Sequence, residues 1–286
     1  MKFTVRISII IFMLAFANLS CKKAKSIDEV TLAAEDKLNI TYGTNAKQVL
    51  DLYLPAKRNE GTNVVVLIHG GFWAAGDKDD LSLYVKTLQN DGYAVANINY
   101  RLATGSASDL HPAQINDITA AINFISAKAG EYSISKDKFG LVGASAGGHL
   151  ALLYAYANNS SNKVKMVISI AGPTNLTEFT NLTEVQKLIT TNFLGKTPQQ
   201  DPALYIAASP ITHVSASAKP TLIIHGKEDL IVPYQQATDL KAKLDFYKVP
   251  NELYKVEGAG HENVISPANS VFAIGKIVSW LHLYLN

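Results

Sequence analysis

A strand, a sharp turn and a helix follow one another without a break in the middle of the chain. Residues 137–142 form a short and mostly apolar segment that is typical of a buried strand. Residues 148–155 are apolar and favour a helix. Between them stands the sequence Gly-Ala-Ser-Ala-Gly, residues 143–147. The small residues on either side of the serine let the backbone turn sharply, so this stretch predicts one βα unit.

The same alternation of strand and helix continues along the chain. We expect an antiparallel strand pair at 38–42 and 49–54, further strands at 64–68, 93–99, 164–170, 220–224 and near Leu253, and helices near 79–90, 115–128, 184–194, 234–246 and 264–285. Repeated βα units predict an α/β fold, with a mostly parallel sheet, helices on both faces and ligands at the carboxyl ends of the strands. The chain has 286 residues, 48% of them hydrophobic, and can bury one such core over residues 37–286.

Ser145 is the central residue of the turn. A serine in the pattern G-x-S-x-G between a strand and a helix is the arrangement known as the nucleophile elbow. The helix that follows directs its N-terminal amides at any anion that forms beside the serine. The alternative is a glycine-rich βα turn in which the serine is incidental.

A nucleophilic serine needs a base, and the base needs a third group that orients it. Glu228 and Asp229 follow the apolar strand that ends near residue 224, and His261 lies in a glycine-rich loop after the last strand. We predict Asp229 as the acid, with Glu228 as the alternative, and His261 as the base. The order of serine, acid and histidine is the one expected of an elbow serine. Without the serine and the histidine, the alternative is that Glu228 and Asp229 are simply two solvent-exposed acids in a loop.

The predicted strand at 64–68 ends in His-Gly-Gly-Phe-Trp, residues 69–73. Two glycines at a strand exit expose backbone amides without side chains in the way. We expect the N–H of Gly71 or Phe72, together with that of Ala146, to bind the negative charge that develops on an attacked carbonyl. The histidine of this segment is expected to bond within the loop.

One long segment, residues 173–208, interrupts the strand–helix rhythm. An ordered insertion over the ligand-binding edge is usually functional, so we predict a small cap that shapes the acyl or alcohol site. The alternative is a surface excursion that only packs. Candidate substrate-lining residues are Trp73, Tyr205 and the pair Phe179 and Phe193, although Trp73 could also simply pack.

These motifs together resemble an α/β-hydrolase over nearly the whole chain after residue 36. Further landmarks in the same order are residues 50–55, 99–102, 111–117 and 209–211. The chain is similar to the bacterial esterase branch related to hormone-sensitive lipase and to feruloyl-esterase-type carboxylesterases. By that resemblance Ser145, His261 and Asp229 form a Ser-His-Asp triad that cleaves carboxylic esters through an acyl-enzyme. The implied substrates are short-chain or carbohydrate-linked acyl esters.

The loop at residues 69–73 departs from the lipase-like pattern, which has His-Gly-Gly-Gly. Its aromatic pair is also similar to kynurenine formamidases, so an aryl formamidase of the N-formylkynurenine type is an alternative. A second alternative is a non-catalytic, anchored binding protein on a hydrolase fold. Replacement of Ser145 by Ala distinguishes the binding role from a catalytic one, because a binding role would survive it.

Metal, cofactor and nucleic-acid functions have no support in the sequence. The scattered histidines show no metal-ligand spacing such as H-E-x-x-H, and no G-x-G-x-x-G fingerprint follows a strand. The formal charge of +2 comes from Lys2 and Arg6, and residues 21–286 carry as many acids as bases. A neutral chain without a basic stripe gives no attraction to nucleic acid.

The N-terminal segment predicts export. Two basic residues precede an apolar run at 9–19, which suits the core of a signal peptide and is too short to span a bilayer. Cys21, the single cysteine, follows at once and resembles the acylated cysteine of bacterial lipoproteins. We expect a lipoprotein-type signal peptide at 1–20, a tether at 21–36 and membrane anchoring through Cys21, in the periplasm or at the cell surface. An ordinary secretory signal or an uncleaved anchor is the alternative.

Overall fold

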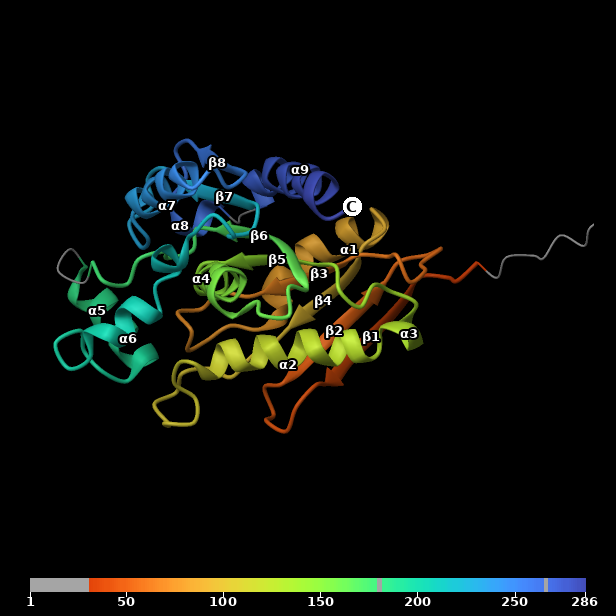
Figure 1. The fold of residues 1–286 in the computed structure, drawn as a ribbon, viewed down its shortest axis with the longest axis horizontal. Helices are drawn as coiled ribbons and strands as arrows, with labels where there is room; N and C mark the ends of the chain where they lie inside the picture. Colours follow the sequence, from red (N-terminus) through yellow and green to blue (C-terminus); the bar gives the residue numbers. More distant parts are fainter. Residues whose placement is uncertain (1–30, 179–181, 265–266) are drawn as a thin grey trace, which may run out of the picture. The chain divides into compact units, whose positions relative to one another are not determined.

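The structure, a computed structural model, describes residues 31–178, 182–264 and 267–286. Within these residues, one eight-stranded sheet has the order β1-β2-β4-β3-β5-β6-β7-β8, with helices on both faces (Figure 1). The predicted signal peptide at 1–20 and Cys21 lie outside the described residues. In the part of the chain that is described, no helix combines the length and the apolar character needed to cross a membrane.

The sheet is parallel except where β2 pairs with its two neighbours. The strands are β1 (Glu35–Thr41), β2 (Val49–Leu54), β3 (Val64–Ile68), β4 (Ala94–Ile98), β5 (Phe139–Ala144), β6 (Val164–Ile170), β7 (Thr221–Gly226) and β8 (Asn251–Val256). Every residue of β3, β4, β5 and β7 is buried. Burial on both faces explains why these segments are continuously apolar instead of alternating.

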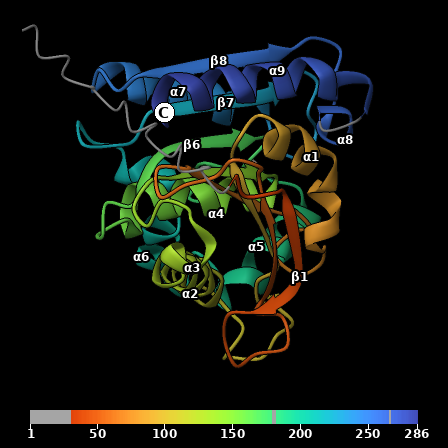
Figure 2. The same ribbon diagram turned by 90° about the vertical axis from the view of Figure 1, so that its right-hand side faces the viewer.

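Helices cover the sheet in two layers (Figure 1 and Figure 2). The α-helices are α1 (Ser82–Asn90), α2 (Ala113–Ala127), α3 (Ala129–Tyr132), α4 (Ala146–Leu153), α5 (Glu184–Leu194), α6 (Pro202–Ala207), α7 (Tyr234–Phe246), α8 (His261–Val264) and α9 (Pro267–Tyr284). Shorter turns are the 3-10 helices η1 (Lys78–Leu81) and η4 (Pro210–His213) and the π-helix η2 (Tyr154–Asn158). Apolar residues of α2, α4 and α7 form the core on one face, and those of α1 and α9 form the core on the other.

The structure confirms the predicted α/β class and the mostly parallel sheet, and differs from the prediction in local details. β1 begins at Glu35, which pairs with Leu54, so the sheet extends two residues into the predicted tether. α6 was not predicted, although Asp201 caps its first turn by accepting from the N–H of Leu204 and Pro202 follows at the first helical position. In place of the predicted last helix at 264–285, α8 ends at Val264 and α9 begins at Pro267, and residues 265–266 between them lie outside the described residues.

The carboxyl ends of four strands carry the segments of the predicted site. The loop that starts at His69 follows β3, Ser145 follows β5, Asp229 lies in the loop after β7, and His261 begins α8 after β8. Parallel strands place these ends at the same edge of the sheet, which is where open α/β sheets bind ligands. The predicted cap lies between β6 and η4 and contains α5 and α6.

Candidate active site

Ser145 lies in the turn between β5 and α4, in a backbone conformation that side chains rarely adopt. Its φ is 52° and its ψ is −119°, and its N–H donates to the carbonyl of Ile170 at 2.7 Å. A Cβ atom on Gly147 would lie 2.0 Å from the carbonyl oxygen of Ile68, and one on Gly143 would lie 2.1 Å from that of Gly147. Both glycines of the motif are therefore required by close backbone approach.

The predicted nucleophile, base and acid lie in one hydrogen-bonded line. Ser145 Oγ is 2.8 Å from His261 Nε2, and His261 Nδ1 is 2.7 Å from Asp229 Oδ2. The serine and histidine are 116 residues apart in the chain, and the histidine and aspartate are 32 apart, so the fold brings them together. A carboxylate at Nδ1 keeps the ring proton there, which leaves Nε2 able to accept the proton of the serine.

Asp229 is buried and accepts hydrogen bonds on both carboxylate oxygens. The N–H groups of Ile231 and Val232 donate to Oδ1, each at 2.8 Å, and Nε2 of His225 is 3.3 Å from Oδ2. Burial raises the pKa of the Asp229 carboxyl, but the hydrogen bonds from His225, His261 and the Val232 amide outweigh it and hold the pKa well below its usual range. The carboxylate is thus charged at neutral pH and can stabilise an imidazolium at His261.

The structure distinguishes the two acids of this loop. Asp229 is buried against His261, whereas Glu228 is exposed and lines a shallow surface hollow. Within the described residues, Asp229 and not Glu228 forms a hydrogen bond with the histidine ring. His225, the buried neighbour of Asp229, was not singled out from the sequence, where its only signal is its place on the strand that leads to the acid loop.

The loop after β3 holds the amides that were predicted to bind an oxyanion. Gly71, Phe72 and Trp73 have positive φ angles of 105°, 56° and 60°. A Cβ on Gly71 would lie 2.3 Å from the carbonyl oxygen of Ala75, so only glycine fits there. The N–H groups of Gly71 and Phe72 have no acceptor among the described residues, and Ala146 lies in the first turn of α4, whose amides lack intrahelical partners. All three residues line cavities that also contain the candidate serine.

His69 fixes the start of this loop. Its Nδ1 donates to the carbonyl of Gly70 at 2.7 Å, and its ring stacks on Tyr100 with the ring centres 4.3 Å apart. The hydroxyl of Tyr100 donates to the carbonyl of His69 at 2.9 Å. Burial lowers the pKa of His69, which keeps the ring neutral. The histidine thus bonds within the loop, as the sequence suggested.

A buried cluster of side chains connects the loop after β3 to α4, the helix that follows Ser145, and to α5 of the predicted cap. Trp73 Nε1 donates to His149 Nδ1 at 3.1 Å, and His149 Nε2 donates to the carbonyl of Ala208 at 2.8 Å. The Trp73 ring stacks on Phe193 of α5, with ring centres 4.3 Å apart. Burial lowers the pKa of His149 to about 3, so the neutral ring can accept from the indole. The position of Trp73 is therefore fixed by both α4 and α5.

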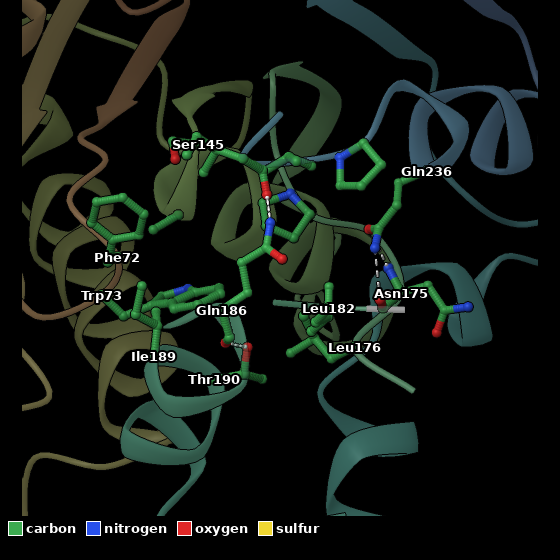
Figure 3. Close-up of a pocket in the computed structure, with 15 residues that line it drawn as sticks. Phe72, Trp73, Ser145, Asn175, Leu176, Leu182, Gln186, Ile189, Thr190 and Gln236 are labelled. Carbon is green, nitrogen blue, oxygen red and sulfur yellow. Dashed lines mark hydrogen bonds between the residues drawn. The ribbon is translucent and has the colours of Figure 1, made fainter. Parts of the chain in front are cut away.

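An apolar cavity opens from Ser145 and is closed on one side by α5 (Figure 3). The space within it, including its open mouth, is about 540 Å³, and no charged side chain lines it. Its apolar walls include Trp73, Leu176, Leu182, Ile189, Ile231 and Val232. Such a lining suits the hydrocarbon part of a small substrate.

A second cavity also contains Ser145 and has a different character. It encloses about 820 Å³ including open space, and its lining includes Gly70, Gly71, Asp80, His261 and Glu262. His261 lines this cavity but not the apolar one. Across the described part of the chain, no group of three or more His, Cys, Asp or Glu side chains is placed to hold a metal ion.

The residues predicted to line the site from the cap lie in several places. Tyr205 is buried, its hydroxyl donates to the carbonyl of Lys196 at 2.9 Å, and it lines neither of the two cavities. Phe193 packs behind Trp73, and Phe179 lies outside the described residues. The cap contributes Leu182 and Ile189 to the apolar cavity instead, residues that the sequence did not single out.

The sequence is similar to known esterases and matches one family model. Residues 50–244 match the family BD-FAE, more than half of the chain. The probable carboxylic ester hydrolase LipM of Mycobacterium tuberculosis is 30% identical over 190 residues, which cover 61% of this chain and 43% of LipM. Esterase LipQ of the same organism is 28% identical over 221 residues, which cover 72% and 52% of the two chains. The chain spans about half the length of these curated relatives.

Solved structures share the same architecture. A truncated carbohydrate esterase from gut microbiota superposes with a TM-score of 0.76 at 23% identity, over 87% of this chain and 96% of the other. A bifunctional GH43-CE protein from Bacteroides eggerthii has a TM-score of 0.76 at 28% identity, over 86% of this chain and 35% of the other. The chain therefore belongs to the BD-FAE family, within the esterase and lipase branch of the α/β-hydrolases.

Proposed function

We propose that the protein is a carboxylic ester hydrolase that works through Ser145, His261 and Asp229. The observation that carries the proposal is the continuous line of hydrogen bonds from the serine through the histidine to a buried carboxylate, at 2.8 and 2.7 Å. The named activities of LipM and LipQ support the same reaction class. A site of this composition has the nucleophile, base and orienting acid that acyl transfer requires.

In the first half of the reaction, Nε2 of His261 takes the proton of Ser145 while Oγ bonds to the ester carbonyl carbon. The carbonyl oxygen becomes an oxyanion, which the amides of Gly71 or Phe72 and of Ala146 stabilise. The carbon–oxygen bond to the alcohol then breaks, and the alcohol leaves with the proton from Nε2. The acyl group stays on the serine.

In the second half, His261 takes a proton from water, and the resulting hydroxide attacks the acyl carbon. The bond to Ser145 Oγ breaks, the serine recovers its proton from Nε2, and the carboxylic acid leaves. The negative charge of Asp229 stabilises the imidazolium that forms in each half. Every step uses groups that the site holds, together with water.

Short-chain or carbohydrate-linked acyl esters are the proposed substrates. The apolar cavity beside the serine is bounded by Leu176, Leu182 and Ile189. These side chains limit the length of an acyl group that can lie there. Likeness to a carbohydrate esterase in fold agrees with a carbohydrate-linked alcohol.

We also propose that the protein is an exported lipoprotein, held to a membrane through an acyl-modified Cys21. The support is the order of two basic residues, the apolar run at 9–19 and a single cysteine. Bacterial lipoproteins typically carry more than one acyl chain, which gives stable anchoring.

The experiment that tests the function uses protein from Lys22 onward and a panel of p-nitrophenyl esters from acetate to decanoate, with methyl ferulate, acetylated xylan and N-formylkynurenine. Hydrolysis that Ser145→Ala lowers by about 10⁶-fold is the expected result for a triad nucleophile. Turnover of N-formylkynurenine alone would assign the protein to the aryl formamidases. Turnover that survives Ser145→Ala would contradict the proposal, and silence of folded protein across the panel would favour the binding role.

A further inference from the structure

The two cavities at Ser145 differ in whether they contain the base. Both include Ser145 and Phe72, but the apolar cavity includes Ala146 and the open cavity includes His261. The serine therefore lies at a junction, with one space beside the amide of Ala146 and another beside the imidazole. In the tetrahedral intermediate, the carbon bonded to Oγ carries two groups, which we call the acyl arm and the alcohol arm. Each arm needs one of these spaces.

Proton transfer decides which arm lies where. The alcohol oxygen must be within hydrogen-bonding reach of Nε2 of His261 when its bond to carbon breaks, because it leaves as the neutral alcohol. The alcohol arm therefore lies in the cavity that the histidine lines. The acyl arm is left with the apolar cavity, whose lining carries no charge.

The lining of the open cavity carries negative charge. Asp80 and Glu262 contribute carboxylates, and no Lys or Arg is among its lining residues. The neighbouring ammonium of Lys78 is compensated, because it lies 2.9 Å from Asp51 Oδ2 and 3.5 Å from Asp79 Oδ1. Among the described residues, the side chains that line this cavity therefore give it a negative potential before the reaction begins, with no lining Lys or Arg to cancel it.

We infer that the cavity lined by His261, Asp80 and Glu262 is the alcohol subsite and that it selects the alcohol by charge. The inference rests on the proposed ester hydrolysis. Esters of cationic alcohols are favoured over esters of uncharged alcohols of the same shape, and esters of anionic alcohols are the poorest substrates. The two carboxylates are hydrogen-bond acceptors as well, so an uncharged alcohol with several hydroxyl groups also fits.

Solvent limits the size of the effect. Asp80 and Glu262 are both exposed, so water and salt screen their charges. Exposed charge pairs each change binding by a small amount, and two carboxylates together give a preference of about fivefold between a cationic alcohol and its neutral isostere. The preference declines as ionic strength rises.

Three acetate esters measure this preference with the acyl arm held constant. Acetylcholine is cationic, 3,3-dimethylbutyl acetate has the same shape without charge, and 3-sulfopropyl acetate is anionic. The full-length protein is assayed for acetate release at low ionic strength, and again with about 1 M NaCl, at which the Debye length is about 3 Å. We expect kcat/KM to fall in the order cationic, neutral, anionic, and the differences to shrink in salt.

The variant Asp80→Asn/Glu262→Gln removes both charges and keeps similar shapes. The ratio of kcat/KM for acetylcholine to that for the neutral ester should fall towards one in this variant, because a loss common to both esters cancels in the ratio. Glu60→Gln/Asp137→Asn removes the same charge from exposed positions next to the amino ends of β3 and β5, and should leave the ratio unchanged.

Each outcome of this experiment decides one question. Equal kcat/KM for the three esters in the wild-type protein, or an unchanged ratio in Asp80→Asn/Glu262→Gln, would overturn the alcohol subsite while ester hydrolysis stands. Failure of all three esters together with the p-nitrophenyl panel would instead remove the proposed function on which the inference rests.

Discussion

Asp229 shows how single residues prepare the candidate site. One of its carboxylate oxygens is held by the amides of Ile231 and Val232, and the other faces His261 with His225 close by. The side chain cannot rotate away from the imidazole without losing two backbone hydrogen bonds. The orientation of the base therefore depends on a short loop whose own amides are satisfied by the acid.

Replacement of Asp229 by Asn tests this role. The amide can no longer hold the proton on Nδ1 of His261, so kcat should fall by about 10³–10⁴-fold, less than the roughly 10⁶-fold loss for His261→Ala. The measurement is kcat for a p-nitrophenyl ester. Glu228→Gln is the matched control in the same loop, and a larger loss in that variant would show that the wrong acid has been assigned.

The indole of Trp73 connects the loop after β3 to α4 through its N–H and to α5 through ring stacking. Trp73→Phe keeps the stacking on Phe193 but leaves the buried Nδ1 of His149 without its donor. The free energy of unfolding in urea should fall by about 1–3 kcal/mol. We expect kcat to fall too, because Trp73 is adjacent to Phe72, whose amide is a proposed oxyanion donor.

The other tryptophan provides the control for this prediction. Trp280 Nε1 donates to Glu252 Oε2 at 2.8 Å, and neither residue lines a cavity that contains Ser145. Trp280→Phe should lower stability and leave kcat unchanged. An unaffected kcat in Trp73→Phe would mean that His149 and Trp73 only stabilise the fold.

At the scale of elements, the first turn of α5 is hydrogen-bonded to the loop after β7, which holds Asp229. Thr183 and Gln186 form a capping box in which Gln186 Oε1 accepts from the Thr183 N–H at 2.7 Å. Gln186 Nε2 donates to the carbonyl of Ile231 at 2.6 Å (Figure 3). The Gln186 side chain thus completes the capping box of α5. It also connects the inserted segment at 173–208 to the loop that holds Asp229.

Gln186→Glu separates these two tasks. Glutamate keeps the acceptor that caps the helix but cannot donate to Ile231, so only the connection to the acid loop is lost. Because a hydrogen bond contributes about 0.5–1.5 kcal/mol, KM for p-nitrophenyl butyrate should rise about two- to tenfold. Thr183→Ala weakens the capping box at the start of α5 but retains the hydrogen bond from Gln186 to the carbonyl of Ile231. Equal KM values in the two variants would contradict this role for Gln186.

Elements with a long, regular pattern could be predicted from the sequence, whereas features made by tertiary contact could not. The buried strand ending at Ile68 and the elbow at Ser145 followed from local residues alone. The contact of His225 with Asp229 depends on the path of a loop, and the wall formed by Leu182 and Ile189 depends on where the cap lies. Tyr205, a candidate lining residue, lines neither cavity at Ser145, and its hydroxyl instead donates to the carbonyl of Lys196.

For the whole molecule, the proposed lipid anchor at Cys21 precedes the predicted hydrolase domain in the sequence. Cys21→Ser should move the protein from the membrane fraction to the soluble fraction of cells that express the full chain, because the acyl chains would be absent. Immunoblots of both fractions measure the distribution, and activity in each fraction shows whether the domain still folds. Membrane association that survives Cys21→Ser would point to an uncleaved apolar anchor instead.

The measurement that tests the central claim most directly is covalent labelling by a fluorophosphonate, followed by mass spectrometry of the intact protein and of its peptides. We expect the wild-type protein to gain one phosphonyl group on Ser145, with fluoride leaving, and His261→Ala to react far more slowly. Ser145→Ala should remain unlabelled. Stoichiometric labelling of another residue, or equal labelling of wild type and Ser145→Ala, would contradict Ser145 as the nucleophile.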